Sequence, residues 1–359
     1  MNSAVPTLQH FIDGAFVPGT EHLDVRNPAD HKLLSRMPVA SAEQIECALD
    51  AARRAQPAWA KRTPQDRAGF LRRIAAGVRE HAPQLARTIM LEQGKVASLA
   101  EIEVAFTADY LDYMAEWARR IEGEIITSDR PGENIFLFRK PMGVVAGILP
   151  WNFPLFLIAR KMAPALLTGN TIVIKPSEET PNNCFEFAKL VAETDLPAGV
   201  FNVVGGMGEV GARLAASERV DMISFTGSVS TGARIMAAAA GNLTKLNLEL
   251  GGKAPAIVLA DADLELAVKA IHASRVINTG QVCNCAERVY VERSVASSFI
   301  ERITAAMAAT RYGDPGRESN LDMGPLINER ALKSVADKVS AAIAQGATVT
   351  TGGAVAART

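Results

Sequence analysis

The spacing of hydrophobic residues predicts mainly helices in the first third of the chain. Apolar positions recur with helical spacing at 41–60, 63–90 and 99–121, and the first segment opens with the capping-box pattern Ser-Ala-Glu-Gln. Residues 11–17 are typical of a hairpin around an Asp-Gly turn. Over 123–145 the apolar positions alternate on both sides of a Pro-Gly turn, which indicates a protruding hairpin.

From residue 144 onward, short apolar runs alternate with helical segments. Such strands are typical of a parallel sheet covered on both faces, so the pattern predicts an α/β fold. A second α/β series starts near residue 256 and ends soon after a strand-like run at 348–350. The other expected strands are 143–149, 171–174, 201–204, 222–225, 245–249, 256–259 and 288–291, and the expected helices are 154–167, 183–193, 209–217, 229–240, 264–277 and two that start at 294 and 329.

Composition limits the classes of function. The chain has 359 residues, 48% hydrophobic and 21% charged, which is usual for soluble globular proteins of two or three domains. A net charge of −1 gives no electrostatic reason to expect nucleic acid or an anionic membrane as a partner. Residues 1–20 lack a secretory pattern and no apolar run approaches the roughly 20 residues that span a bilayer, so a cytoplasmic location is the default. Four cysteines argue against a disulfide framework and leave room for a reactive thiol.

Five short segments carry the candidate chemistry. They are Pro150-Trp-Asn-Phe-Pro154, Lys175-Pro-Ser-Glu178, Phe225-Thr-Gly-Ser228, Glu249-Leu-Gly-Gly-Lys253 and Gly280-Gln-Val-Cys283. Each is weak alone, but in this order they resemble the aldehyde dehydrogenase superfamily, and the resemblance covers essentially the whole chain. Residues 106–117 and 283–288 further resemble the lactaldehyde dehydrogenase group, which also acts on glycolaldehyde.

The resemblance implies three parts of the fold. A Rossmann-type, NAD-binding domain is expected at 1–122 and 144–252, an oligomerisation hairpin at 123–143, and an α/β catalytic domain at 253–359. A homo-oligomer, dimer or tetramer, is expected for the full-length protein. Members of the family normally continue well beyond this length, so the resemblance also implies a C-terminally truncated chain with an incomplete catalytic domain.

The resemblance also implies the reaction, which is oxidation of an aldehyde to a carboxylate through a thioester. A bare carbonyl carbon cannot release hydride, so a thiolate must add first, and this role falls to Cys283. The side chain of Asn152 and the backbone N–H of Cys283 would bind the resulting oxyanion. Glu249 would then activate the water that hydrolyses the thioester. Lys161 matches a lysine usual in the family and is counted with the catalytic residues.

Each of these residues has an ordinary structural alternative. Asn152 could cap the helix expected from residue 154, and Glu249 could be an ion-pair partner. Cys283 could be a buried structural thiol, the commonest fate of cysteine. Cys285 is the rival nucleophile, but the family places its nucleophile two residues after the glutamine, which selects Cys283.

The expected cofactor is NAD, and no metal is expected. A Gly-x-Gly-x-x-Gly fingerprint occurs at 206–211, but the resemblance places the diphosphate at the later loop 227–232, beside Ser228 and a helix N-terminus. It places Lys175 and Glu178 on the adenosine ribose, where a carboxylate repels a 2′-phosphate and favours NAD over NADP; a surface Lys–Glu pair is the alternative. The predicted cofactor residues are Leu149, Trp151, Lys175, Ser177, Glu178, Gly208, Gly211, Phe225, Gly227, Ser228, Gly232 and Leu250.

The substrate is expected to be a small aldehyde contacted by Arg160, Asn284 and Phe153. Arg160 stands where many relatives carry a large aromatic residue, and a cation suits a polar or anionic aldehyde better than a long alkyl one. A surface arginine paired with a carboxylate is the alternative. A dehydrogenase that acts on lactaldehyde or glycolaldehyde is favoured over three alternatives. They are a semialdehyde dehydrogenase, a CoA-acylating relative and an inactive cofactor-binding fragment. The CoA-acylating relatives usually lack the base found here at position 249.

Overall fold

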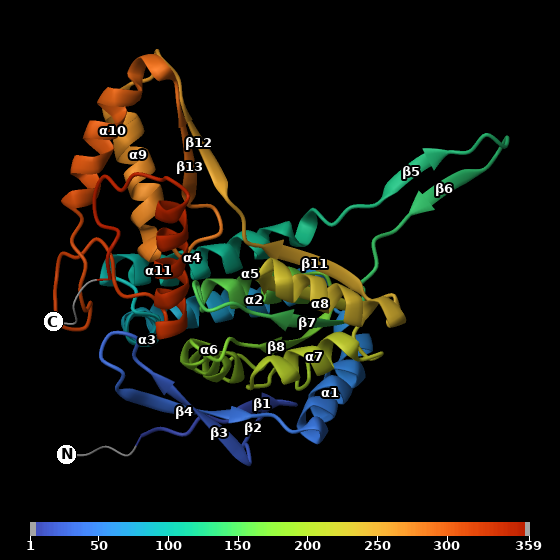
Figure 1. Ribbon diagram of the computed structural model, residues 1–359. Coiled ribbons are helices and arrows are strands. Elements are labelled where there is room, and N and C mark those ends of the chain that lie inside the picture. Colours follow the sequence, from blue (N-terminus) through green and yellow to red (C-terminus); the bar gives the residue numbers. More distant parts are fainter. Residues whose placement is uncertain (1–4, 356–359) are drawn as a thin grey trace. The chain divides into compact units, whose positions relative to one another are not determined.

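The structure, a computed structural model, describes residues 5–355 and divides into two units (Figure 1). The larger unit comprises Met1–Arg26, Leu33–Glu92 and Ala100–Leu250. The second comprises Asn27–Lys32, Gln93–Leu99 and Gly251–Thr359. Each unit has hydrophobic clusters of its own.

A seven-stranded sheet in the order β11-β10-β7-β8-β9-β1-β2 forms the larger unit, which confirms the α/β fold. Neighbours from β11 to β9 are parallel, and β1 and β2 follow antiparallel. The strands β7 and β8 are buried along their whole length, which explains their continuous apolar sequences. The bounds are β1 His10–Ile12, β2 Ala15–Val17, β7 Val144–Ile148, β8 Thr171–Lys175, β9 Phe201–Val203, β10 Met222–Gly227, β11 Lys245–Leu250, α5 Phe156–Leu167, α6 Asn182–Ala192, α7 Gly208–Ala216, α8 Val229–Ala239 and η2 Ala240–Asn242.

The first helix confirms the capping box. Helix α1 (Ala42–Lys61) begins after Ser41, whose hydroxyl accepts from the backbone N–H of Gln44 while the Gln44 side chain accepts from that of Ser41, both at 3.1 Å. Four further helical segments follow: α2 (Pro64–Glu80), α3 (Ala82–Gln93), α4 (Ala97–Glu116) and η1 (Trp117–Arg119).

The single helix expected over 63–90 is wrong. The helix α2 ends at Glu80, His81 is its C-cap, and α3 begins at the next residue, Ala82. Pro83 explains the interruption, because proline lacks the backbone N–H that a continuous helix would use and its ring clashes with the preceding turn.

Two antiparallel hairpins belong to the larger unit. Strands β3 (Glu21–Arg26) and β4 (Leu33–Val39) form the first, and β5 (Glu124–Thr127) and β6 (Asn134–Leu137) form the second. The hairpin β5–β6 projects away from the sheet of its unit (Figure 1). Its side chains are exposed on both faces, although most of them are apolar.

The second unit is a small α/β arrangement. Parallel strands β12 (Ala254–Val258) and β13 (Ala286–Val291) pair with each other, and Val258, Val268 and Phe299 are the buried centre of its cluster. Its helices are α9 Leu264–Val276, η3 Ile277–Gly280, α10 Arg293–Ala308 and α11 Glu329–Ala344. The strand expected at 348–350 is wrong, because these exposed residues follow α11 as irregular chain that pairs with no strand of the described part.

Helices that could cross a membrane would be long and apolar, and residues 5–355 contain none.

Candidate active site

A buried carboxylate positions the segment that carries Asn152. Oε1 of Glu103, on α4, accepts hydrogen bonds from the backbone N–H groups of Leu155 and Phe156, at 2.9 and 3.1 Å. These groups open α5, whose N-cap residue makes no side-chain cap of its own. Glu103, which is 2% exposed, therefore provides the hydrogen-bond acceptor for the backbone N–H groups at the start of α5. The alternative in which Asn152 caps this helix loses its support. Glu103 was not predicted from the sequence, where its one signal is a carboxylate on the buried face of a helix.

The amine of Lys161 is buried and held by two hydroxyl groups. Its Nζ donates to Oγ1 of Thr226 at 2.9 Å and to Oγ of Ser224 at 3.2 Å. Ser224 and Thr226 are two positions apart on β10, so their side chains lie on the same face of the sheet. Burial lowers the pKa of Lys161 to about 7, while the carboxylate of Glu249 raises it and Arg160 lowers it further. An amine with this pKa can exchange a proton near neutral pH.

Glu249 lies on β11, directly opposite Thr226 in the parallel register of β10 and β11. It is exposed, and no ion pair between the described residues includes it. The ion-pair alternative for Glu249 therefore has no support. The larger unit brings Glu249 within electrostatic range of the Lys161 amine.

The segment before Cys283 adopts an unusual backbone in the second unit. Asn278, Thr279 and Gly280 have successive φ values of 48°, 59° and 72°. The left-handed region is costly for residues with a Cβ, so the surrounding contacts must hold it in place. The hydroxyl of Thr279 donates to the carbonyl of Gly324 at 3.0 Å.

Gln281 fixes the same segment at its other end. Its Nε2 donates to the carbonyl of Asn278 at 3.1 Å, and its Oε1 accepts from the backbone N–H of Ile327 at 3.0 Å. Two residues later, Cys283 is exposed, whereas Cys285 is 2% exposed. The buried-thiol alternative therefore describes Cys285, and Cys283 is the accessible thiol of the pair.

The predicted cofactor residues follow the carboxyl ends of parallel strands, where α/β sheets bind ligands. Lys175 ends β8 at 4% exposure, and its Nζ donates to Oε2 of Glu178 at 3.2 Å. Burial lowers the pKa of Lys175, and Glu178 opposes this shift. The Lys–Glu pair forms, but its amine is buried, unlike that of a surface pair.

Ser228 lies at the start of α8, and its hydroxyl accepts from the backbone N–H of Thr231 at 3.2 Å. Its exposed position at a helix N-terminus suits an anion. The other predicted residues cluster in the same places. Leu149 and Trp151 follow β7, Ser177 follows β8, Gly208 and Gly211 lie on α7, Phe225 and Gly227 on β10, Gly232 on α8 and Leu250 at the end of β11.

Arg160 is exposed beside Lys161, and it forms no ion pair with a carboxylate among residues 5–355. The salt-bridge alternative for Arg160 therefore has no support. Burial raises the pKa of Tyr110, and the nearby guanidinium of Arg160 opposes this shift. The Tyr110 ring contacts that of Phe156 edge-on, with centroids 5.6 Å apart. Of the other predicted substrate residues, Phe153 packs against the core of the larger unit and Asn284 follows Cys283 in the second.

An aromatic cluster was missed by the sequence analysis. The Phe106 and Phe156 rings lie 4.8 Å apart, and Phe106 is 56% exposed. The residues come from α4 and α5, about fifty positions apart, so no local pattern joins them.

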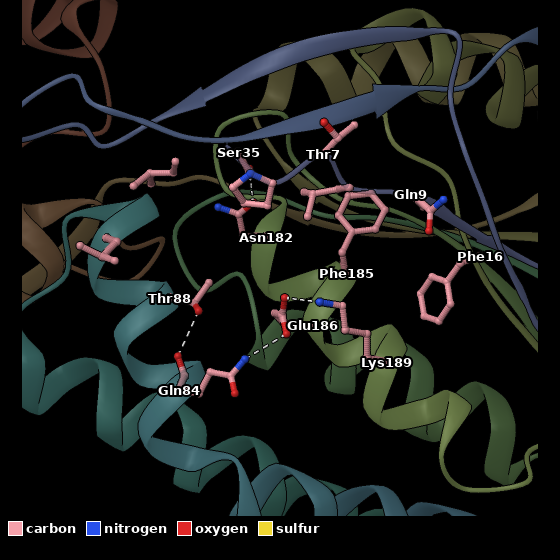
Figure 2. A pocket seen from close by; sticks show the side chains of 14 residues that line it. Thr7, Gln9, Phe16, Ser35, Gln84, Thr88, Asn182, Phe185, Glu186 and Lys189 are labelled. Atoms are coloured by element: carbon pink, nitrogen blue, oxygen red, sulfur yellow. Dashed lines mark hydrogen bonds and ion pairs between the residues drawn. The ribbon is translucent and has the colours of Figure 1, made fainter. Parts of the chain in front are cut away.

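A separate cavity of about 590 Å³ lies in the larger unit. Figure 2 shows side chains from the N-terminal segment, α3 and α6 around it, with Glu186 accepting from Lys189 at 2.7 Å and from Gln84 at 3.2 Å. None of the predicted site residues lines it. Residues 5–355 also contain no cluster of three or more His, Cys, Asp or Glu placed to hold a metal ion.

Comparison with known proteins decides the family. The sequence model of the "Aldehyde dehydrogenase family" matches residues 16–359. The chain belongs to the aldehyde dehydrogenase family. It is 60% identical over 351 residues to lactaldehyde dehydrogenase of Escherichia coli (strain K12), covering 96% of this chain and 73% of that protein. A crystal structure of lactaldehyde dehydrogenase from Escherichia coli superposes with a TM-score of 0.96 at 60% identity, over 98% of this chain and 74% of that one. Glutarate-semialdehyde dehydrogenase of Pseudomonas aeruginosa (strain PAO1) is 39% identical, over 96% of this chain and 72% of that protein.

This aldehyde dehydrogenase therefore oxidises an aldehyde, and members of its family use NAD or NADP. The predicted resemblance to lactaldehyde dehydrogenase is confirmed, and the semialdehyde dehydrogenases are more distant relatives.

Proposed function

We propose that this aldehyde dehydrogenase oxidises a small hydroxyaldehyde, such as lactaldehyde or glycolaldehyde, with NAD through a thioester on Cys283. The observation that carries the substrate class is the exposed guanidinium of Arg160, which no carboxylate of the described residues neutralises. It lies near Tyr110, whose ring contacts that of Phe156. The 60% identity to lactaldehyde dehydrogenase supports the same class.

In the first half-reaction, the thiolate of Cys283 adds to the aldehyde carbon. The exposed position of Cys283 supports this role. The side chain of Asn152 and the backbone N–H of Cys283 stabilise the oxyanion, since donors fixed in advance stabilise developing charge. Glu103 contributes indirectly by fixing the start of α5, just after Asn152. The residues after β7, β8 and β10 would hold the cofactor, which would supply the hydride acceptor, and loss of the hydride from the adduct on Cys283 would leave the thioester.

In the second half-reaction, Glu249 takes a proton from water, which then attacks the thioester. The carboxylate of Glu249 is exposed and so accessible to water. Lys161 lies within electrostatic range, and its pKa of about 7 suits a group that passes protons on. A carboxylate at this position supports release of the free acid over transfer to CoA.

For the cofactor, we propose NAD. The pairing of Lys175 with Oε2 of Glu178 leaves Oε1 to accept from a ribose hydroxyl, and a 2′-phosphate would meet a negative charge. Replacing Glu178 with Ser should remove this repulsion and raise kcat/KM for NADP relative to NAD. Equal use of both cofactors by the unmodified enzyme would refute the role of Glu178.

We also propose roles for the parts of the chain. Residues 1–122 and 144–252 bind the cofactor, residues 253–359 carry catalytic groups, and the hairpin at 123–143 pairs subunits in a dimer or tetramer. The exposed apolar side chains of β5 and β6 support the last assignment.

The substrate assignment is tested by NADH formation with lactaldehyde, glycolaldehyde, succinate semialdehyde and a medium-chain alkyl aldehyde. We expect the highest kcat/KM with the two hydroxyaldehydes. The variant Arg160→Leu should lose this preference and gain relative activity with the alkyl aldehyde, because an arginine facing an apolar substrate is left unpaired. Highest activity with succinate semialdehyde would favour the semialdehyde alternative.

A further inference from the structure

A second concave site lies in the larger unit. The cavity of about 590 Å³ has the size of a small-molecule binding site, for which roughly 300–1,000 Å³ is usual. Its walls come from the N-terminal segment, β2, β4, α3 and α6 (Figure 2). None of the residues assigned to the aldehyde, the cofactor or the reaction lines it, so the proposed function gives this cavity no role.

Two helices line the cavity with one face each, since their lining residues recur three or four positions apart. The helix α3 contributes Gln84, Thr88 and Leu91, and α6 contributes Asn182, Glu186 and Lys189. Two hydrogen bonds join the helices: Nε2 of Gln84 donates to Glu186 at 3.2 Å, and the backbone N–H of Asn182 donates to Oε2 of Glu92 at 2.7 Å. Thr88 lies on α3 between these two connections, so the cavity is formed by elements that are fixed to each other.

The charged residues of the lining neutralise each other. They are Glu186 and Lys189, and Oε1 of Glu186 accepts from Nζ of Lys189 at 2.7 Å. An ionic ligand would have to leave water for a lining whose charges are already paired, which is costly. The cavity therefore favours an uncharged molecule.

Apolar side chains offer a surface for the body of a ligand. The aliphatic members of the lining are Pro6, Leu8, Leu34 and Leu91, and the aromatic members are Phe16 and Phe185. Small-molecule sites are lined mainly by such side chains, with a few polar groups that fix the orientation of the ligand. A ring is therefore the expected body of the ligand.

The polar side chains along one side of the cavity keep hydrogen-bonding capacity (Figure 2). Oδ1 of Asn182 accepts from the hydroxyl of Ser35 at 2.5 Å, and no hydrogen bond among the described residues uses its Nδ2. Gln84 donates through Nε2 to Glu186, and no hydrogen bond in that part of the chain uses its Oε1. The hydroxyl of Thr88 donates to the backbone carbonyl of Gln84 at 3.0 Å and can still accept. One donor group and two acceptors are the complement of a primary carboxamide, which has one carbonyl and two N–H groups.

We propose that this cavity binds a small uncharged carboxamide whose ring lies against the apolar lining. The amide carbonyl accepts from Nδ2 of Asn182, and its two N–H groups donate to the hydroxyl of Thr88 and to Oε1 of Gln84. A ligand held in this way adds a connection between α3 and α6. It therefore stabilises the larger unit without occupying the positions of the aldehyde or the cofactor.

Benzamide is the probe, and benzoate, which has the same shape and a negative charge, is its matched control. Calorimetric titration should show benzamide bound about tenfold more tightly than benzoate or better, because the lysine of the lining is already paired. Benzamide should also raise the melting temperature. Saturating NAD, and lactaldehyde in a separate titration, should not displace it. Displacement by NAD or lactaldehyde, or equal affinity for benzamide and benzoate, would overturn the proposal.

The variant Glu186→Gln tests whether the probes meet this lining. It keeps an acceptor oxygen but leaves the amine of Lys189 without its counter-charge. We expect affinity for benzoate to rise, while most of the affinity for benzamide remains. Unchanged affinity for benzoate would show that the probes bind elsewhere and would contradict the proposed site.

Two changes at Thr88 test the position of the ligand. Thr88→Phe fills the cavity and should abolish benzamide binding, whereas Arg87→Phe, an exposed neighbour outside the lining, should bind as the unmodified protein does. Thr88→Val keeps the shape of the side chain and loses only the hydroxyl, so it remains informative if Thr88→Phe does not fold. We expect it to bind benzamide about two- to tenfold more weakly, the effect of one hydrogen bond. Unweakened binding by either Thr88 variant would refute the site.

Discussion

At the scale of single residues, Asn152 and Glu249 are assigned to different half-reactions, and their variants should fail at different steps. Glu249→Gln should leave the first hydride transfer largely intact, so rapid mixing should give a burst of NADH followed by slow turnover. Asn152→Ala should lose the burst rate itself, by about 100- to 1,000-fold, because one oxyanion donor is removed.

Rapid-quench measurement of the thioester checks this division. The thioester should accumulate in Glu249→Gln and should not accumulate in Asn152→Ala. If both variants are slowed at the same step, the two roles are wrongly divided. Lys245→Gln, an exposed residue at the start of the same strand, is the control for β11 and should behave like the unmodified enzyme.

Lys161 should make stability depend on pH. Its pKa is about 7 in the folded protein against an ordinary value of 10.5, so between these pH values the unfolded chain holds a proton that the folded protein has released. Stability rises with pH wherever the unfolded state binds more protons. Below pH 7 both states are protonated, and the full cost of a buried ammonium group remains.

Urea unfolding of the wild type and of Lys161→Met, from about pH 6 to about pH 10, measures this difference. We expect the free energy of unfolding of the wild type to rise relative to that of the variant from pH 7 upward. Parallel curves would mean that the buried amine is not the titrating group.

At the scale of secondary-structure elements, the sequence predicted what local chemistry determines. The capping box at Ser41, the buried strands β7 and β8 and the hairpin β5–β6 all follow from patterns within a few residues. The boundary at His81 was missed because the helical spacing continues across it. The strand expected at 348–350 has suitable residue types but no partner strand, and a strand needs one.

The candidate site was predictable only where a motif carries it. Cys283, Glu249 and Lys175 belong to recognisable segments. The structure places Cys283 on a turn, Glu249 near the end of β11 and Lys175 at the end of β8. Glu103 and Phe106 were missed because their partners lie about fifty positions away in the sequence, and no local periodicity reveals such contacts.

The cap that Glu103 provides predicts a coupling between α4 and the catalytic segment. In Glu103→Ala, one buried and one partly buried N–H group at the start of α5 lose their acceptor, which should cost about 1–3 kcal/mol of stability. The rate of the NADH burst should fall as well, because Asn152 precedes this helix start. Glu103→Gln keeps an acceptor oxygen and should lose much less of both.

Urea unfolding and rapid-mixing kinetics measure the two effects on the same protein. Glu101→Ala is the matched control, since Glu101 lies on the same helix but is exposed. If Glu103→Ala is as stable and as fast as Glu101→Ala, the hydrogen bonds to α5 are not needed.

At the scale of the whole molecule, the hairpin β5–β6 is an element whose apolar side chains are exposed in the single chain. It is a sheet of only two strands, and such a sheet is marginally stable alone. Ile125 is 73% exposed and Phe138 78% exposed, and Phe136 stacks on Phe138 with ring centroids 6.5 Å apart. Exposed apolar patches with open strand edges indicate a protein interface, and homo-oligomers are the commonest assemblies.

A second copy of this chain is therefore the expected partner of the hairpin. Light scattering during size-exclusion chromatography should give a mass of two or four chains for the unmodified protein. Phe138→Asp should lower this mass and the melting temperature together, because a charge replaces an apolar contact in the interface. Leu243→Asp is the control, since Leu243 is 87% exposed on the same unit but lies outside the hairpin. A monomeric unmodified protein, or equal masses for both variants and the unmodified protein, would show that the hairpin does not join subunits.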